Sequence, residues 1–160
     1  MSGVASSNCG GQGPFANAAS ADGTVIVGSL DGTLPPTCFP GRPYQLTPTI
    51  VQLFGGVNPP SGLASGVNAD GSVIVGRIGV SNGASCNPCT QAFRLAGGNT
   101  TIIGDFGGNF SAALGVSADG SVVVGSGAVN IVASQPFRWT APTGLQFVQD
   151  LLTASGQNLS

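Results

Sequence analysis

The most regular feature of the chain is a polar turn followed by a short apolar run, and it occurs three times. Residues 67–76 read V-N-A-D-G-S-V-I-V-G, and closely related stretches occupy residues 19–28 and 116–125. The aspartates of the three copies, Asp22, Asp70 and Asp119, lie 48 and 49 residues apart. A repeat of about 50 residues is typical of an array of one supersecondary unit, in which each unit covers its neighbour.

Each repeat contains four short apolar runs, which predict four antiparallel strands joined as a meander. In the third repeat these strands are expected at residues 112–117, 121–126, 136–139 and 145–149. Between the first two strands, Ala and Asp fit the right-handed positions of a type I turn, and glycine fits the left-handed position that follows. The residues assigned to this turn are Asp22, Gly23, Asp70, Gly71, Asp119 and Gly120.

The repeats divide one domain, residues 1–160, into units of about 12–56, 57–108 and 109–160, with residues 1–11 as the tail of a preceding unit. Longer loops are expected at residues 30–42, 79–90 and 127–135. The second strand of each unit is apolar almost throughout, which indicates that both of its faces are covered. We therefore predict an all-β fold of four-stranded, β-propeller-like blades, with a β-trefoil as the alternative. Since propellers typically contain about 4–8 blades, three units suggest a fragment of a longer array or an oligomer.

Composition narrows the function more than the fold. The chain has four Arg and six Asp but no Lys, Glu or His. Such sparse positive charge argues against nucleic-acid binding, which requires neutralisation of many phosphates. Without His or Lys there is no Ser-His-Asp system and no Schiff-base lysine. Two aspartates could serve as a glycosidase pair, but they are scattered, so we expect no enzyme activity, no catalytic residues and no cofactor.

The repeat motifs resemble the HAF-type extracellular repeat of bacterial surface proteins and autotransporter passengers. Residues 115–125 and 66–76 match its G-(V/I)-(S/N)-x-D-G-x-V-V-G hairpin, residues 92–95 and 136–139 its A-F-R-W strand, and residues 103–108 its glycine-rich return. The first unit departs from the pattern at residues 43–46, which suggests a degenerate or capping unit. The resemblance implies an extracellular or outer-membrane-associated location, with any export signal upstream. Its implied partners are further repeats or a downstream outer-membrane barrel.

Four cysteines, Cys9, Cys38, Cys86 and Cys89, are expected at one end of the blades, because alternating strand directions bring their loops together. An even count in an exported protein favours disulfides, and we favour the pairs Cys9–Cys38 and Cys86–Cys89. A four-cysteine zinc site lacks the usual paired spacings, and a redox pair at residues 86–89 would not open a helix. Each hairpin offers a single carboxylate, whereas Ca²⁺ loops use several, so no metal site is expected.

The remaining candidates are large side chains in the third strands of the units. Trp139, Arg94 and Arg138 could contact a ligand, although core packing and Arg–Asp pairs with Asp105 and Asp150 are the simpler expectations. Two hypotheses follow: a structural scaffold of an autotransporter-like passenger, or an adhesion module that binds carbohydrate or protein through its long loops. A homo-oligomer is compatible with both.

Overall fold

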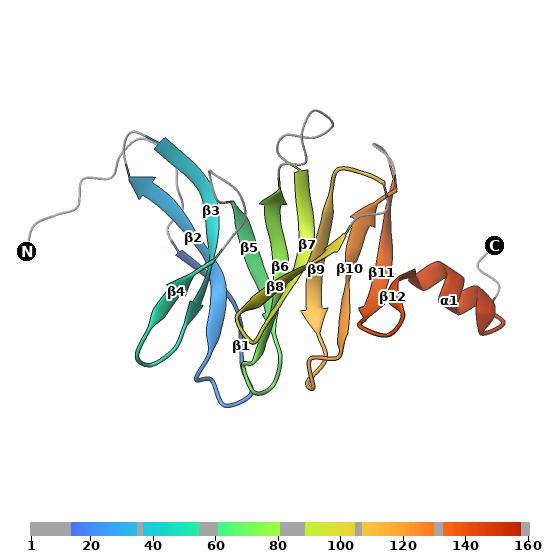
Figure 1. The fold of residues 1–160 in the computed structure, drawn as a ribbon, viewed down its shortest axis with the longest axis horizontal. Helices are drawn as coiled ribbons and strands as arrows, with labels where there is room; N and C mark the ends of the chain where they lie inside the picture. The colour runs from blue at the N-terminus through green and yellow to red at the C-terminus, as the bar shows by residue number, and fades with distance from the viewer. Residues whose placement is uncertain are drawn as a thin grey trace, which may run out of the picture.

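The chain folds into twelve strands and one short helix (Figure 1). The computed structural model describes residues 14–34, 37–54, 61–80, 89–104, 107–129 and 133–157. The elements are β1 (Pro14–Ala19), β2 (Ile26–Leu34), β3 (Thr37–Leu46), β4 (Val51–Leu53), β5 (Gly62–Val67), β6 (Val73–Val80), β7 (Cys89–Ala96), β8 (Asn99–Gly104), β9 (Ser111–Val116), β10 (Val122–Ala128), β11 (Ser134–Thr140), β12 (Gly144–Phe147) and α1 (Val148–Ala154).

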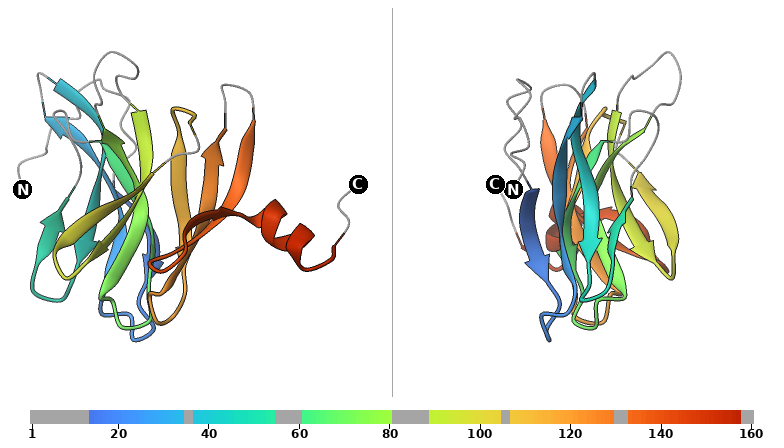
Figure 2. Two further views of the ribbon diagram at one scale, coloured as in Figure 1. Left: turned by 45° about the vertical axis from the view of Figure 1, so that its right-hand side comes forward. Right: turned by 90° about the vertical axis from the view of Figure 1, so that its left-hand side faces the viewer.

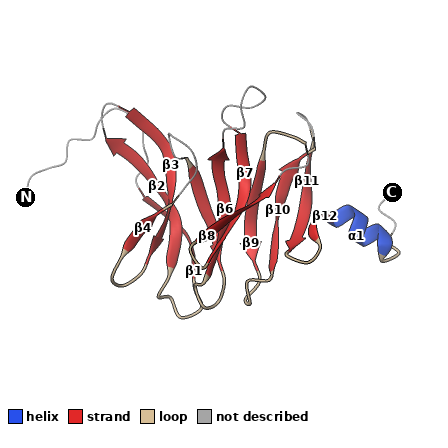
Figure 3. Cartoon of the chain, in the orientation of Figure 1, coloured by secondary structure: helices blue, strands red, loops and turns tan. Residues whose placement is uncertain are grey.

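The strands form three separate four-stranded sheets, β1–β4, β5–β8 and β9–β12, which we call the first, middle and third sheets. Every pair within a sheet is antiparallel and joins strands that follow each other in the chain. The predicted all-β fold of repeated four-stranded antiparallel units is therefore confirmed (Figure 3). The three sheets do not close into a ring. In a β-trefoil, strands of different units pair with one another in a shared barrel. None of the strands named above pairs with a strand of another sheet.

Two predicted boundaries were wrong. The expected loop at residues 30–42 is largely a hairpin, because β2 continues to Leu34 and β3 starts at Thr37. The last strand was expected to reach Gln149, but β12 ends at Phe147 and α1 begins at Val148. Asp150 lies in the first turn of α1, where its charge favours the helix dipole. No described helix is long and apolar enough to cross a membrane.

A glycine lies opposite an aromatic residue at the same point of each sheet. Gly76 pairs with Phe93 and Gly125 with Phe137, and Gly28 pairs with Tyr44 in the first sheet. A Cβ on Gly125 would lie 2.1 Å from the Ala112 carbonyl oxygen and 2.7 Å from the Phe137 ring. All three glycines therefore let the first strand approach the second strand closely, and Gly28 and Gly125 also make room for the aromatic ring.

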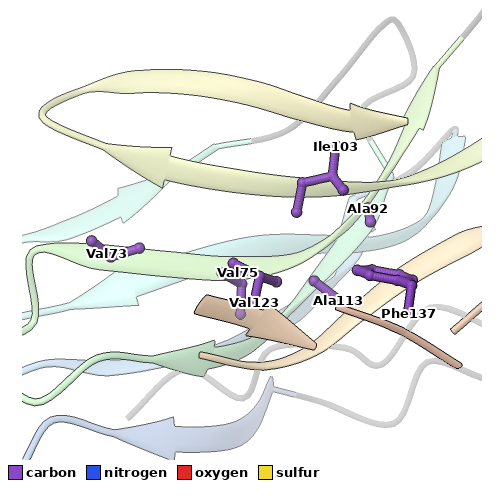
Figure 4. Close-up of a cluster of buried hydrophobic side chains, with 7 residues drawn as sticks. All are labelled: Val73, Val75, Ala92, Ile103, Ala113, Val123 and Phe137. Atoms are coloured by element: carbon purple, nitrogen blue, oxygen red, sulfur yellow. The ribbon is translucent and has the colours of Figure 1, made fainter. Parts of the chain in front are cut away.

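The sheets pack face to face through two apolar clusters. One lies between the first and middle sheets and consists of Val25, Val27, Ala64, Ile74, Ile78 and Phe93. The other lies between the middle and third sheets and consists of Val73, Val75, Ala92, Ile103, Ala113, Val123 and Phe137 (Figure 4). Seen from the side of β1–β4, the sheets lie one behind another (Figure 2, right). The middle sheet is thus covered on both faces, as its apolar second strand predicts.

Candidate functional site

The three Asp-Gly turns join the first two strands of each sheet and lie along one edge of the molecule (Figure 1). In the first turn, the Gly23 N–H donates to the Ser20 carbonyl at 2.9 Å, and the Ser20 N–H donates to the Val25 carbonyl at 2.8 Å. Gly23, Gly71 and Gly120 have φ values of 71°, 77° and 74°. These are the left-handed conformations that glycine adopts at little cost.

Each turn aspartate accepts hydrogen bonds from its own turn. The Asp22 carboxylate accepts from the Ser20 and Thr24 hydroxyls at 2.7 and 2.9 Å and from the Thr24 N–H at 3.0 Å. Asp70 and Asp119 make the equivalent bonds to the N–H and hydroxyl of the serine two residues later. In each turn the Oδ1 atom of the carboxylate thus accepts both a backbone and a hydroxyl hydrogen bond from its own hairpin.

These hydrogen bonds favour the charged carboxylates. The Ser20 hydroxyl and then the Thr24 N–H lower the pKa of Asp22 to about 2. The Ser117 hydroxyl and then the Ser121 N–H lower the pKa of Asp119 to about 2. The pKa of Asp70 is also lowered, chiefly by the Ser72 hydroxyl. A general acid or base acting near neutral pH needs a pKa near the working pH, so these aspartates suit a structural role better than proton transfer.

The turns are also bonded to one another in a ladder. The Ala21 N–H donates to the Ala69 carbonyl at 2.9 Å, and the Ala69 N–H donates to the Ala118 carbonyl at 3.1 Å. The same alanine of each turn thus connects successive sheets through its backbone. The sequence carries a signal for this contact, since a small residue stands before Asp-Gly in all three copies, but sequence analysis missed its role.

At both junctions, a valine of one repeat covers the turn glycine of the next. The place of a Cβ on Gly71 lies 2.4 Å from Val25 Cγ2, and that of a Cβ on Gly120 lies 2.6 Å from Val73 Cγ2. Nothing lies within 4 Å of the corresponding point on Gly23. The glycines at the second and third turns therefore serve two purposes, the left-handed turn and close approach between sheets.

Arg94 links the middle sheet to the third. Its Nε and Nη2 donate to the Gly120 carbonyl at 3.3 and 3.1 Å, and its guanidinium carbon lies 6.0 Å from the centre of the Trp139 ring. Trp139 is half-buried and packs against the cluster between these sheets. Arg138 instead donates to Gln146 Oε1 at 3.2 Å within its own sheet. Arg94 and Trp139 thus take part in packing between the middle and third sheets.

Of the two expected Arg–Asp pairs, only Arg138–Asp150 joins two described residues, and the structure shows no ion pair there. Arg138 donates to the Gln146 side-chain amide, and Asp150 is exposed on α1. Asp105 lies outside the described residues. The expected Arg94–Asp105 pair therefore stays a prediction.

A shallow groove follows each sheet junction beside the turn. One is lined by Arg94, Asp119, Gly120, Ser121, Trp139, Ala141 and Pro142. The other is lined by Gln45, Gln52, Gly71, Ser72, Ile74, Leu95, Gly97 and Gly98. Arg94 and Trp139 of the first groove correspond to Gln45 and Leu95 of the second. The two grooves therefore lie at equivalent places, but only the first has a cation and an aromatic ring. Among the described residues, no group of three His, Cys, Asp or Glu side chains could hold a metal ion.

The cysteine cluster falls mostly outside the described part of the chain. Cys89 begins β7, is buried and is disulfide-bonded. Cys9 and Cys86 lie outside the described residues, and of Cys38 only the backbone, in β3, is described. The pairs Cys9–Cys38 and Cys86–Cys89 therefore stay predictions.

Comparison with known proteins supports the fold rather than a function. No model of a known protein family matches the chain, and no curated protein matches it in sequence. The resemblance to HAF-type repeats therefore stays a prediction. The chain is similar in structure to TolB in the crystal structure of TolB from Acinetobacter baumannii, with a TM-score of 0.53 and 17% sequence identity. The alignment covers 84% of this chain and 31% of the TolB chain. TolB is a β-propeller, so the sheets resemble propeller blades.

Proposed function

We propose that the chain is a non-enzymatic structural repeat segment of an exported bacterial surface protein, of the kind found in autotransporter passengers. The observation that carries this proposal is that its polar and charged side chains form hydrogen bonds within the fold. The turn aspartates bond within their hairpins, and Arg94 bonds to the next sheet. The aspartate and arginine side chains thus stabilise the individual hairpins or the contact between sheets.

The repeated inter-sheet contact gives the proposal a physical basis. Both junctions combine a backbone bond between turns, a valine over a glycine and an apolar cluster. Stability in such arrays comes from contacts between neighbouring units. An array of this kind can be lengthened by adding further units, because each unit contacts only its neighbours. This property suits a scaffold outside the cell.

Adhesion is the competing function, and the described grooves favour it less. The groove beside Trp139 is the one with an aromatic ring and a cation, yet both are engaged with each other. The predicted binding role of residues 79–90 stays untested, because residues 81–88 lie outside the described part of the chain.

The location test is protease shaving of intact source cells, followed by fractionation and an immunoblot for this segment. A surface scaffold predicts that the segment lies in the outer-membrane or medium fraction and is lost on shaving. A cytoplasmic, protease-protected band would contradict the proposal. A glycan and host-protein binding screen with the β6–β7 loop shortened would reveal adhesion as a loss of binding, with the intact chain as control.

A further inference from the structure

The two ends of the stack expose positions that are buried everywhere else. We call the face of a sheet that looks toward the next sheet its forward face, and the opposite face its backward face. On the forward faces, Val27 and Val75 are 0% exposed, whereas their equivalent in the third sheet, Val124, is 46% exposed. On the backward faces, Ala64 and Ala113 are 0% exposed, whereas their equivalent in the first sheet, Ala16, is exposed.

The turn ladder also ends with one free donor and one free acceptor. Within the described residues, the Ala118 N–H has no partner equivalent to those of Ala21 and Ala69, and the Ala21 carbonyl accepts no bond. At the first turn Gly23 is uncovered, while at the third sheet Val122 has no glycine to cover. The third sheet thus has an unused N–H donor and an uncovered valine on its forward side. The first sheet has the matching unused carbonyl and uncovered glycine on its backward side.

From this complementarity we propose that two copies of this chain associate head to tail, the third sheet of each packing on the first sheet of the other. The contacts continue the interface already present twice within one chain. Interfaces of this heterologous kind close into rings where the rotation allows. Two copies supply six sheets, which falls within the 4–8 blades typical of propellers, whereas three copies exceed that range. The inference rests on the scaffold function proposed above and names its partner.

The exposed apolar residues at the two ends support a protein partner of this kind. Val51 pairs with Leu46 across β3 and β4, so the two side chains share one face. Leu46 is the equivalent of Leu95, which packs against the cluster between the first and middle sheets. Val51 therefore lies on the free backward face, where it is 62% exposed. Leu114, beside Val124 at the other end, is also largely exposed.

The first test measures mass by light scattering over a wide range of concentrations of the 160-residue chain. A dimer gives twice the 15.6 kDa mass of one chain. Val124→Asp and Val51→Asp each place an unpaired carboxylate in the interface, and each should weaken association by on the order of 100-fold. Ile102→Asp is the matched control, because Ile102 is similarly exposed but lies in the middle sheet. It should leave association unchanged.

Mixing the two variants distinguishes the head-to-tail arrangement from a symmetric face-to-face pair. Each variant keeps one intact face, and these faces are complementary, so an equimolar mixture should regain heterodimers that neither variant forms alone. A dimer weakened by only one of the two substitutions would indicate a face-to-face pair and overturn the proposal. A chain that is monomeric at all concentrations would also overturn it, and would point to further repeats of a longer chain as the natural neighbour.

Ala118→Pro tests the turn ladder separately. Proline is favoured at this position of a type I turn, and the N–H that it removes has no partner within the described monomer. Folding should be unaffected, while the dimer loses one hydrogen bond at each interface and weakens roughly tenfold. Ala118→Ser keeps the N–H and should behave as the parent chain; equal association of both variants would contradict a continued ladder. Surface location is untouched by these results, so failure here and failure of the proposed function can be distinguished.

Discussion

The second strands of the middle and third sheets begin with nearly the same four residues, VIVG and VVVG, but have different surroundings. Val75 in β6 and Val124 in β10 occupy the same position before a glycine, yet Val75 is fully buried and Val124 is about half exposed. The difference arises because the middle sheet has a neighbour on each side and the third sheet has one. The repeat therefore specifies two faces that need covering, and the position in the stack decides whether a given face is covered.

Having a neighbouring sheet should have its largest effect on stability when the turn glycines of the monomer are replaced by alanine. Gly71→Ala places a Cβ 2.4 Å from Val25 Cγ2, and a β-branched side chain has little freedom to move away. Adding this overpacking to the left-handed backbone cost, we expect a loss of about 3 kcal/mol in the free energy of unfolding. Gly23→Ala meets no atom within 4 Å, so only the backbone cost of about 1 kcal/mol applies.

Urea unfolding, at protein concentrations too low for copies to associate, measures both free energies of unfolding. The two glycines have closely similar φ values, so Gly23→Ala serves as the control for backbone strain. Equal losses for the two variants would show that inter-sheet contact at the turn contributes nothing. At concentrations where copies associate, the gap between the variants should narrow, because Gly23 would then be covered as well.

A smaller effect is expected when the matched valines are shortened. Val75→Ala removes two buried methyl groups from the cluster between the middle and third sheets, which should cost about 2 kcal/mol of stability. Val124→Ala removes the same atoms from an exposed site in the monomer, and should cost less than about 0.5 kcal/mol. Chemical unfolding of the pair, with unchanged m-values, checks the comparison. A Val124→Ala loss as large as that of Val75→Ala would mean that the forward face of the third sheet is already covered.

Sequence patterns predicted much of this fold because the information is local. A turn before an apolar run, repeated three times, was enough to predict four-stranded antiparallel units, since turn chemistry and apolar runs act within a few residues. The helix α1 was missed because only seven residues form it, too few for a clear helical pattern. The long β2–β3 hairpin was missed because residues 30–42 carry turn-forming Gly and Pro, which suggest a loop more strongly than a strand.

Contacts between sheets were harder to predict than contacts within them. The turn aspartates bond to residues two positions away, which spacing alone suggests. Arg94, by contrast, bonds to Gly120, 26 residues later in the chain, and its target is a backbone carbonyl that carries no side-chain signature. Two arginines at equivalent places therefore look alike in sequence, although only Arg94 has a following sheet in the chain.

The two arginines provide the next comparison. Arg94→Ala leaves the buried Gly120 carbonyl without the guanidinium donor and removes the contact with Trp139, so we expect a loss of about 1.5 kcal/mol. Arg138→Ala removes one bond to Gln146 at the open end, and we expect a loss of about 0.5 kcal/mol. Tryptophan fluorescence adds a direct measurement, because only Arg94→Ala removes the cation from the Trp139 ring. A larger loss for Arg138→Ala would argue against Arg94 as the inter-sheet link.

The smallest effect should be one that does not depend on position in the stack. Asp22 lies in an open turn and Asp119 in a covered one, yet the pKa of each is lowered to about 2 by bonds inside its own hairpin. A carboxyl whose pKa is lowered on folding stabilises the fold above its unfolded pKa, near 3.8. That contribution fades as the pH falls toward about 2.

Asp22→Asn and Asp119→Asn keep an acceptor oxygen but remove this titration. The difference in stability between parent and variant should therefore be constant above about pH 5 and shrink between pH 4 and pH 2, with the same profile at both sites. Thermal unfolding of the two variants across this pH range, on monomeric samples, measures the profiles. A pH profile present at Asp119 and absent at Asp22 would mean that the neighbouring sheet, rather than the hairpin alone, lowers the pKa of the turn aspartate. The turns would then depend on their position in the stack, as the sheet faces do.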